Sequence, residues 1–537
     1  MRSSRALTPT EVTQLERRGN IATDWDLVKV TEQGFSALNI RNTYFRGRAY
    51  LGANLEIIGA TISGYEILDN SVIINSTLEA VDNVIHILNE SGNRLIYCTP
   101  GLTPQIAYME AFHTYKPGLQ DGFSKLQSAD DFCTVDKNVT IKNGCTIHNS
   151  YIGHDTTLEG FTADNCFIAD NCHLAFGEGV SAFCGPMTVS HHKSTLLIAG
   201  LYSFYNAGSN TNASNHNYRL GPIHQAIYGR GVKSGSGSYI LQPAHIGDFT
   251  MVVGKHYNHP DTSKLPFSYL VEKDDSSFIF PAQCFKSIGM WRDLAKWPTR
   301  YKLANDAIVP DFSIHRPTYI NRLFQAANIL EDLLNKAKGD VVSYEGCRIQ
   351  KIMIKPAIET YRNMAQALLM VRYAMKRKEC NGFVGVEGDC QNWKWIDLCG
   401  SWFNKKVIDT VEKNIADGKY SSLDKITDEL FFLQQTKQHN IVKAIVSMMH
   451  TYLNIDDLTD TQKINAEIAK AKSTLEALLD TLLFDAKRES NGRMSVGYGL
   501  DGDEGDCQAD FSFIHPSLDA DTEAAVKVIR TYIEALS

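Results

Sequence analysis

Histidines crowd one part of this sequence. The chain has 537 residues and 16 histidines, most of which fall within the segment from His148 to His259. These are His148, His154, His173, His191, His192, His216, His224, His245, His256 and His259. An imidazole changes its protonation state near neutral pH and can take a proton from a hydroxyl or an amine, so a positioned histidine suits the role of general base in acyl transfer. The sequence therefore predicts a catalytic site in this segment.

The stretch GRGVKSGSGS, from Gly229 to Ser238, is basic and rich in glycine and serine. Its backbone amides could hold a phosphate group, with Arg230 and Lys233 supplying positive charge. The stretch matches neither the GxxxxGK[ST] loop nor the GxGxxG loop. A flexible surface loop is therefore the alternative interpretation.

A metal site is a second chemical hypothesis. His256 and His259 stand three residues apart in the stretch GKHYNHPD. Together with His191, His192 or His224 they could give zinc three nitrogen ligands and leave one position open for water. Because an HxxH pair in a proline-containing loop is frequent by chance, we favour a protein without a metal. Histidines that are hydrogen-bonded within a polar loop network remain a further alternative.

A repeat of six residues decides the expected architecture. The hexads are IIGATI (57–62), ILDNSV and IINSTL (67–78), VDKNVT, IKNGCT and IHNSYI (135–152), and IADNCH, LAFGEG and VSAFCG (168–185). A period of six does not fit the 3.6-residue period of a helix. Three hexads close one triangular coil of about eighteen residues in a parallel β-helix of the hexapeptide class. We expect this β-helix to be left-handed, with the aliphatic residues inside and asparagine or aspartate at the corners. The alternative, an antiparallel sandwich, has turn signals every 8–12 residues.

The fold class that follows is a β + α multidomain protein, in which a left-handed parallel β-helix precedes a mainly α-helical C-terminal domain. We expect an N-terminal cap segment at 1–45, the β-helix at 46–290 and the helical domain at 291–537. The β-helix should carry an insertion at about 90–132, where IYCTPGLTPQIAYMEAFHTYKPG interrupts the repeat, and a His-rich loop region at 190–270. Helical spacing of apolar residues supports the last domain. Examples are Ile320, Leu323, Phe324, Ala327, Leu330 and Leu334.

Composition excludes several classes of partner. The net charge of -8 offers no general attraction to nucleic acid, whose binding depends on phosphate neutralisation by lysine and arginine. The 12 cysteines are scattered and form no CxxC pair, which favours reduced thiols and a cytoplasmic location. The sequence shows neither the apolar core of a signal peptide nor an apolar run long enough for a membrane span. We therefore expect a cytoplasmic protein without nucleic-acid or membrane partners.

The hexads resemble those of the hexapeptide-repeat transferases, which include acetyltransferases and acyltransferases acting on sugars, nucleotide sugars and amines. The segments SHHKSTLLIAG, SNHNYRLGPIHQ and GKHYNHPDTSKLPFSYL are also similar to an uncharacterised bacterial family, a domain of unknown function with a trimeric-transferase-like left-handed β-helix. The resemblance implies a homotrimer, a loop histidine as base, and acyl-coenzyme A or acyl-carrier protein along the prism between subunits. The chain departs from the transferases because the regular repeat fades after Gly185.

This resemblance turns the histidine cluster into a functional hypothesis. The protein would transfer an acyl group from acyl-coenzyme A or a similar donor to a sugar, nucleotide sugar or related small hydroxyl or amine acceptor. The candidate bases are His191, His192, His224, His256 and His259, and the candidate contacts to donor or acceptor phosphates are Lys193, Arg230, Lys233 and Lys255. Two alternatives remain. One is a non-catalytic binding or assembly module for a phosphorylated sugar or nucleotide, and the other is a zinc-dependent hydratase or hydrolase like the gamma-class carbonic anhydrases, which the chain resembles only in the repeat.

Overall fold

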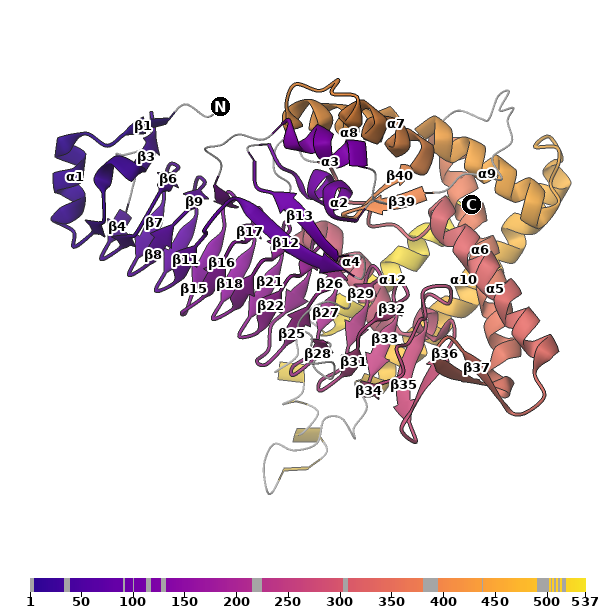
Figure 1. The fold of residues 1–537 in the computed structure, drawn as a ribbon. Coiled ribbons are helices and arrows are strands. Elements are labelled where there is room, and N and C mark those ends of the chain that lie inside the picture. The colour runs from indigo at the N-terminus through magenta and orange to yellow at the C-terminus, as the bar shows by residue number, and fades with distance from the viewer. Residues whose placement is uncertain are drawn as a thin grey trace.

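A computed structural model describes residues 4–32, 39–89, 92–99, 101–112, 117–126, 132–214, 225–302, 308–379, 395–436, 438–489 and 518–537, together with a few single residues between 502 and 513. The N-terminal half is a β-solenoid, a tapering column of stacked coils, and the C-terminal half is mainly helical and lies against the far end of this column (Figure 1). The predicted β-solenoid followed by helices is therefore confirmed.

Three long sheets form the sides of the solenoid, with 11, 11 and 14 strands among the described residues. Sheet A contains β1 (Ser4–Ala6), β3 (Val28–Thr31), β6 (Ala49–Leu51), β9 (Tyr65–Ile67), β14 (Cys133–Val135), β17 (Tyr151–Ile152), β20 (Phe167–Ile168), β23 (Phe183–Cys184), β26 (Gly200–Tyr202), β29 (Ala226–Tyr228) and β32 (Ala244–Ile246). Sheet B contains β2 (Ile21–Ala22), β5 (Tyr44–Phe45), β8 (Thr61–Ser63), β11 (Thr77–Glu79), β16 (Thr146–His148), β19 (Thr162–Asp164), β22 (Glu178–Val180), β25 (Leu196–Ile198), β28 (Asn212–Ser214), β31 (Tyr239–Leu241) and β34 (Lys255–His256).

Sheet C is the longest of the three. It contains β4 (Asn39–Arg41), β7 (Glu56–Ile58), β10 (Val72–Ile74), β15 (Thr140–Lys142), β18 (Thr157–Glu159), β21 (His173–Ala175), β24 (Val189–Ser190), β27 (Asn206–Ala207), β30 (Lys233–Ser234), β33 (Met251–Val253), β35 (Tyr269–Lys273), β36 (Ser276–Phe280), β38 (Cys347–Gln350) and β37 (Val341–Tyr344). Strand β38 pairs in parallel with β36. Sheet C therefore continues from the solenoid into the C-terminal half.

Each coil is often shorter than the eighteen residues that three hexads predict. Thr61 pairs with Thr77, 16 residues further along the chain, whereas Glu178 pairs with Leu196, 18 residues further along. Many corners are asparagines with positive φ, such as Asn70 at 61° and Asn171 at 56°. Asparagine adopts this left-handed conformation more readily than other side chains, which lets the chain turn sharply between short strands.

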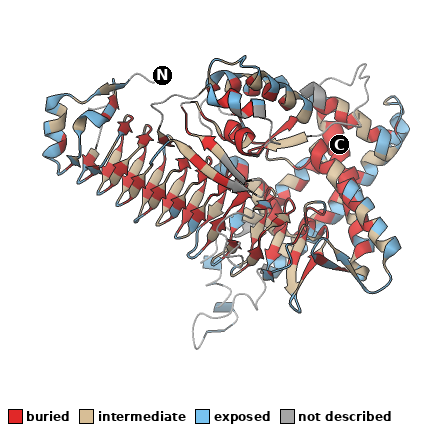
Figure 2. Cartoon of the chain, in the orientation of Figure 1, coloured by how far each residue is buried: buried red, intermediate tan, exposed pale blue. Residues whose placement is uncertain are grey.

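Aliphatic side chains stack along the inside of the prism. On sheet C the residues Ile57, Ile73, Ile141, Leu158 and Leu174 lie in register and are fully buried. The buried residues run along the whole column in Figure 2. This column of aliphatic contacts is the hydrophobic core that holds the coils together.

The solenoid continues beyond Gly185, where the regular sequence pattern fades. Residues 190–270, expected to be a His-rich loop region, contain strands β25 to β34 and the start of β35 among the described residues, joined by turns and by an irregular stretch at 257–268. The interior changes its filling here. Tyr202, Tyr205 and Tyr228 are buried with ring centres 4.9–5.4 Å apart, beside the small residues Ala207 and Ala213. In these coils large aromatic rings next to alanines take the place of the aliphatic residues, so the six-residue pattern is no longer visible in the sequence.

The solenoid also begins earlier than residue 46. Helix α1 (Pro9–Glu16) covers its first coil, but β2 already pairs with β5, and β3 with β6, within the segment 1–45 that was expected to be a cap. Where an insertion is expected at about 90–132, the chain forms the hairpin of β12 (Val84–Asn89) and β13 (Gly92–Tyr97), which begins before that range, and then α2 (Pro104–Phe112) and α3 (Pro117–Ser124). This insertion lies over sheet A, where Tyr108 meets Phe183 with ring centres 5.8 Å apart.

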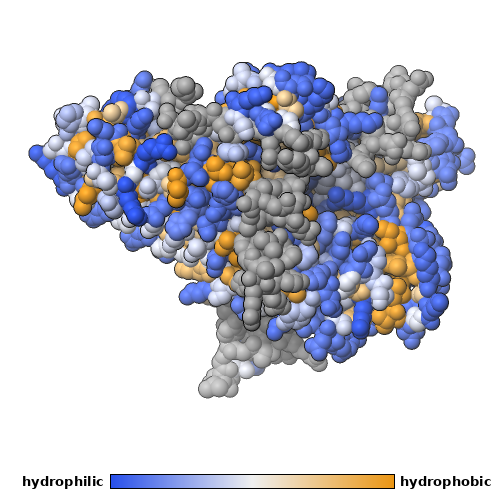
Figure 3. Space-filling view, in the orientation of Figure 1, coloured by the Kyte–Doolittle hydropathy of each residue, from blue (hydrophilic) through white to orange (hydrophobic). Residues whose placement is uncertain are grey.

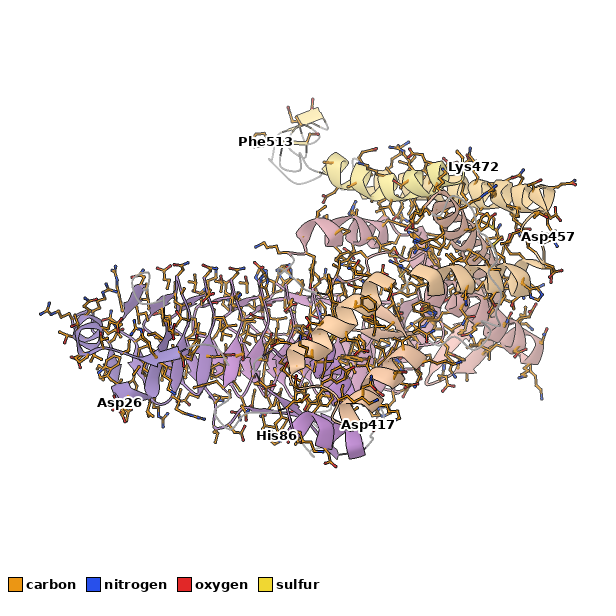
Figure 4. All side chains as sticks on the ribbon, turned by 90° about the horizontal axis from the view of Figure 1, so that it is seen from above. Asp26, His86, Asp417, Asp457, Lys472 and Phe513 are labelled. Carbon is orange, nitrogen blue, oxygen red and sulfur yellow. The ribbon has the colours of Figure 1, made fainter. Side chains whose placement is uncertain are left out.

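The C-terminal half packs around the last coils. Its helices are α4 (Ile288–Arg300), α5 (Pro317–Lys336), α6 (Lys351–Glu379), α7 (Lys405–Ala416), α8 (Leu423–Thr436), α9 (Gln438–Leu453), α10 (Thr461–Glu489) and α12 (Leu518–Ala535). The hairpin of β39 (Trp395–Leu398) and β40 (Ser401–Asn404) lies between these helices and the solenoid. Seen from above in Figure 4, His86 of the insertion and Asp417 at the end of α7 lie on the same side of the column.

We expect Leu158→Ala to lower the free energy of unfolding by about 2–5 kcal/mol, because it removes a fully buried side chain from the stacked core and leaves a cavity. Lys142→Ala is the matched control on the same sheet. Lys142 is solvent-accessible and its ion pair with Glu159 is long, at 3.7 Å, so its loss should cost less than about 1 kcal/mol. Urea unfolding of both variants measures the difference, and equal midpoints would contradict the stacked core.

Candidate active site

The outward-facing side chains of sheet A form a ladder that changes from aromatic to polar. Phe183, Leu201, Ile227 and His245 lie on successive strands and in register. Along this part of the ladder lies a cavity of about 920 Å³, between the solenoid, the insertion, α5 and the β39–β40 hairpin. The ladder therefore forms the floor of the cavity, with His245 at its last position.

Helix α5 supplies one wall of the cavity. Arg322, Gln325, Ile329 and Asp332 line it and are spaced three, four and three residues apart, which places them on one face of the helix. The opposite face carries the buried Leu323, Phe324 and Leu330 that pack into the core. Helix α5 therefore has two faces with different roles: the apolar face anchors the helix in the core, and the polar face lines the cavity.

Two arginines and an aspartate form a charged group on the cavity wall. Arg322 Nη1 lies 2.5 Å from Asp248 Oδ2, and the backbone N–H of Arg230 donates to Asp248 Oδ1 over 3.0 Å. Asp248 thus accepts hydrogen bonds at both oxygens. The neighbouring Gly229 makes room for this, because a Cβ atom at its position would lie 2.4 Å from Asp248 Oδ1. Asp248 therefore holds the guanidinium of Arg322 and the backbone of Arg230.

The tip of the β39–β40 hairpin binds to the same group. Gly400 has a φ of +89°, its carbonyl accepts from Arg230 Nη1 over 3.1 Å, and its N–H donates to Asp397 Oδ1 over 2.6 Å. Burial raises the pKa of Asp397 to about 6, although Arg230 and the Gly400 N–H act in the opposite direction. Asp397 is thus a carboxyl group that can change protonation within the cavity in mildly acidic solution.

Among the described residues, His245 is the histidine that lines the cavity. Burial lowers its pKa below the ordinary value of 6.5, while the negative charges of Asp261 and Asp248 partly oppose that shift. The neutral imidazole therefore predominates at neutral pH. A neutral imidazole facing a cavity can accept a proton.

The structure spreads the candidate bases over different surroundings. His191 and His192 are exposed in the turn between β24 and β25, and the ring of His191 contacts that of His173 with centres 4.5 Å apart. His256 is fully buried and its Nδ1 lies 2.8 Å from Ser277 Oγ. His259 is exposed, with Nδ1 3.2 Å from the carbonyl of Pro243. His224 lies outside the described residues.

The four described candidates do not line the cavity, so their catalytic role stays a prediction. The candidate phosphate contacts are also dispersed. Lys193 is exposed over the ring of Phe176, Lys233 pairs with Asp293 at 2.5 Å, and Lys255 is exposed on β34. Arg230 is the one member of this set that lies in the cavity. The stretch from Gly229 to Ser238, interpreted as a loop or phosphate cradle, contains strand β30 and solenoid corners.

Four residues of the cavity are not indicated as site residues by the sequence pattern: His245, Asp248, Arg322 and Asp397. Two signals could have found the first three. The stretch HIGD places His245 at a strand and Asp248 in the corner that follows it, and Arg322 begins a polar stripe on a helix whose other face is apolar. Asp397 comes from a hairpin far along the chain, so its arrival at the solenoid depends on tertiary packing.

The described residues show neither a metal cluster nor a membrane span. Within them, no group of three or more histidine, cysteine, aspartate or glutamate side chains is placed to hold a metal ion. Across the same part of the chain, every helix is too short or too polar to cross a bilayer.

The surface facing the viewer in Figure 3 is largely hydrophilic, with scattered hydrophobic patches.

The fold and the cavity define a class: a β-solenoid with a helical cover and a polar cavity between them. Residues 125–334 match the family model described as domain of unknown function DUF4954, and residues 385–531 match the domain of unknown function DUF6819. Two segments of the chain are therefore similar to domains of unknown function, in line with the predicted resemblance to an uncharacterised family. No curated protein matches the sequence. Neither family match is to the hexapeptide transferases, so that resemblance stays a prediction. The first matched segment contributes His245, Asp248 and both arginines to the cavity, and the second contributes Asp397.

The buried His256 yields a prediction about stability and pH. Burial lowers its pKa to about 4, whereas an unfolded histidine titrates near 6.5. Below pH 6.5 the unfolded chain therefore binds a proton that the folded chain does not, and stability is lost as the pH falls toward 4. We expect His256→Asn to remove up to roughly 3 kcal/mol of this loss.

Urea unfolding at pH 7 and at pH 4.5 measures the effect. The difference between the two pH values should be smaller for His256→Asn than for the wild type, and unchanged for the control His192→Asn, whose side chain is exposed. Parallel pH dependences for the wild type and His256→Asn would contradict this explanation.

Proposed function

We propose that the protein is a transferase that moves an acyl group onto a hydroxyl of a small, sugar-like acceptor, and that the cavity over sheet A is its active site. The observation that carries the proposal is the position of His245, a histidine with a lowered pKa on the floor of a cavity of about 920 Å³. Cavities of about 300–1,000 Å³ are typical for small-molecule and cofactor sites.

His245 would act as the general base. The acceptor hydroxyl oxygen attacks the carbonyl carbon of an acyl thioester, and its proton passes to the neutral imidazole of His245. The carbon–sulfur bond then breaks, and the protonated imidazole returns the proton to the departing thiolate. The acceptor itself is the nucleophile, so the protein contributes position and proton transfer rather than a covalent intermediate.

The walls of the cavity suit a sugar-like acceptor. Tyr108, Trp395 and Trp402 supply aromatic rings against which the apolar face of a sugar can pack. Asp397 and Asp248 supply carboxylate oxygens that accept hydrogen bonds from hydroxyl groups. A cavity with aromatic walls and a few placed polar groups is typical of specific small-molecule binding.

The handedness of the solenoid, its repeat class, the oligomeric state and the cellular location are also part of this proposal. We infer a left-handed solenoid of the hexapeptide class, supported by its two- to three-residue strands and by the asparagines with positive φ at its corners. We infer a homotrimer that packs through sheets B or C, because the insertion and the C-terminal half already cover much of sheet A. The described cysteines are all free and buried, which supports a cytoplasmic location.

Light scattering tests the trimer. We expect a mass near three times the 59.9 kDa of one chain. A monomeric mass would contradict the trimer while leaving the proposed active site intact, because every residue of the cavity comes from one chain.

A second candidate function is a binding module that holds a phosphorylated sugar or nucleotide without changing it. Asp248 and Arg322 favour this candidate because they line the cavity as an ion pair at 2.5 Å, and such a pair can hydrogen-bond a polar ligand without any proton transfer. The two candidates differ in turnover. A binding module should release an unchanged ligand and consume no acyl donor.

We expect His245→Asn to lower kcat about 10²- to 10⁴-fold, because removal of a general base costs a rate factor of that order. Its melting temperature should stay close to that of the wild type, since the side chain faces the cavity. Release of free thiol from acetyl-coenzyme A, measured over a panel of sugars and sugar phosphates, provides the assay. His191→Asn, exposed and outside the cavity, is the matched control.

The pH profile provides a second readout. Because the pKa of His245 is lowered, the midpoint of the acidic limb of the pH profile should lie below pH 6.5. The variant Asp397→Asn measures how much the Asp397 carboxyl group contributes to the acidic limb of the pH profile. Full activity in His245→Asn rejects His245 as the base, and no turnover in the wild type with any acceptor favours the binding module.

A further inference from the structure

Arg230 and Arg322 belong to different elements but line the same cavity. Arg230 follows β29 at a corner of the solenoid, and Arg322 lies in α5. Asp248 contacts the side chain of one and the backbone of the other. We propose that these two guanidinium groups form a subsite for a phosphate group, so that the ligand of the cavity is phosphorylated.

Arg230 carries the strongest evidence. It is only 3% exposed, and its guanidinium lies over the ring of Phe204 at 4.2 Å from the ring centre. Nη1 donates to the carbonyl of Gly400, whereas the buried Nη2 has no hydrogen-bond partner in the described structure. Buried donors in proteins are almost always satisfied, and an unsatisfied one points to a missing water, ion or ligand. A phosphate oxygen would satisfy it with a charge-assisted hydrogen bond.

Arg322 completes the subsite from the facing wall. Its ion pair with Asp248 uses Nη1, and its guanidinium lies 5.5 Å from the ring centre of Trp402. Arginine has five N–H donors in a planar fork, so one ion pair leaves further donors for a ligand. Its side chain is 39% exposed, which leaves it accessible from the cavity. Exposed Lys264 lies at the same cavity and adds a further cation.

Phosphate fits these groups better than a carboxylate does. A phosphate presents oxygens in several directions and can accept from two arginines on different walls, whereas a carboxylate presents two oxygens in one plane. Nearby Asp397 opposes any anion, so its charge should weaken binding. Neutralising that charge should therefore have the opposite effect to removing an arginine.

The phosphate subsite specifies the ligand of the proposed active site. It rests on the proposed function only where the acyl-transfer reaction is concerned. The phosphate could belong to the acceptor, as in a sugar phosphate, or to the acyl donor, as in coenzyme A. Both sources present the same chemistry to the arginines. Two pairs of probes distinguish them: glucose 6-phosphate against glucose, and coenzyme A against pantetheine.

Calorimetry on the intact protein tests the inference, with intrinsic tryptophan fluorescence, to which Trp395 and Trp402 of the cavity contribute, as a second signal. We expect the phosphorylated member of at least one pair to bind about ten times more tightly or better, since a hydrogen bond to a charged group is worth a factor of about 10–100. Arg322→Gln should reduce that preference by about the same factor. Asp397→Asn, which keeps an oxygen for the Gly400 N–H, should increase it.

Arg362→Gln is the matched control. Arg362 lies on α6, pairs with Glu331 at 2.6 Å and is 45% exposed, but it does not line the cavity. Its loss should leave the preference unchanged. Arg230→Lys keeps the charge but loses the planar fork, so it should reduce the preference even where the protein melts at the wild-type temperature.

Two results would overturn the subsite. One is equal affinity for the members of both pairs in the wild type, and the other is a preference that survives in Arg322→Gln. If Arg230→Lys folds with a lowered melting temperature and an unchanged preference, Arg230 only holds the hairpin and the assignment fails for that residue. Because binding is measured without turnover, an intact preference without acyl transfer leaves the subsite standing and removes the transferase proposal instead.

Discussion

Parallel stacking of short strands in register is the constraint on which this structure depends. Each coil lies directly on the previous one, so many strand residues have a paired neighbour 16 to 18 residues away, and the separation is larger where the chain between two coils is longer, as between Leu201 and Ile227. Side chains that point inward stack into a continuous core, and side chains that point outward form ladders on the flat faces of the solenoid. A residue placed on one coil therefore occupies a position fixed by all the coils beneath it. His245 owes its place in the cavity floor to this stacking, since it continues the column of Phe183, Leu201 and Ile227.

The cavity arises where this ladder stops being apolar. The insertion packs Tyr108 onto Phe183, and beyond that point the C-terminal half covers the face with polar residues of α5 and the β39–β40 hairpin. The hairpin is held at its tip, where Gly400 adopts a φ of +89° and receives the guanidinium of Arg230. A Cβ atom at this position would lie 2.9 Å from the ring of Phe204. A rigid floor and a firmly docked wall keep the charged groups of the cavity at fixed separations.

The sequence reveals the solenoid but only part of the site. Hexads such as IINSTL are local, so the stacking of Ile57 on Ile73 follows from the spacing of aliphatics alone. The tyrosine-filled coils escape this pattern because Tyr202, Tyr205 and Tyr228 replace aliphatics with a different shape. The density of histidines points to His191 and His256, one of which is exposed and the other buried in the core. Arg230 was recognised from its local charge, but its meeting with Arg322 and Asp397 depends on how three distant segments pack.

The division of the cavity between two matched segments has an evolutionary consequence. Arg230 sits in the first segment and the carbonyl that receives it sits in the second. A gene that lost the second segment would leave the guanidinium of Arg230 and the ring of Phe204 without their contacts to Gly400. The two segments should therefore be inherited together, and replacements at their shared boundary should occur as correlated pairs across lineages.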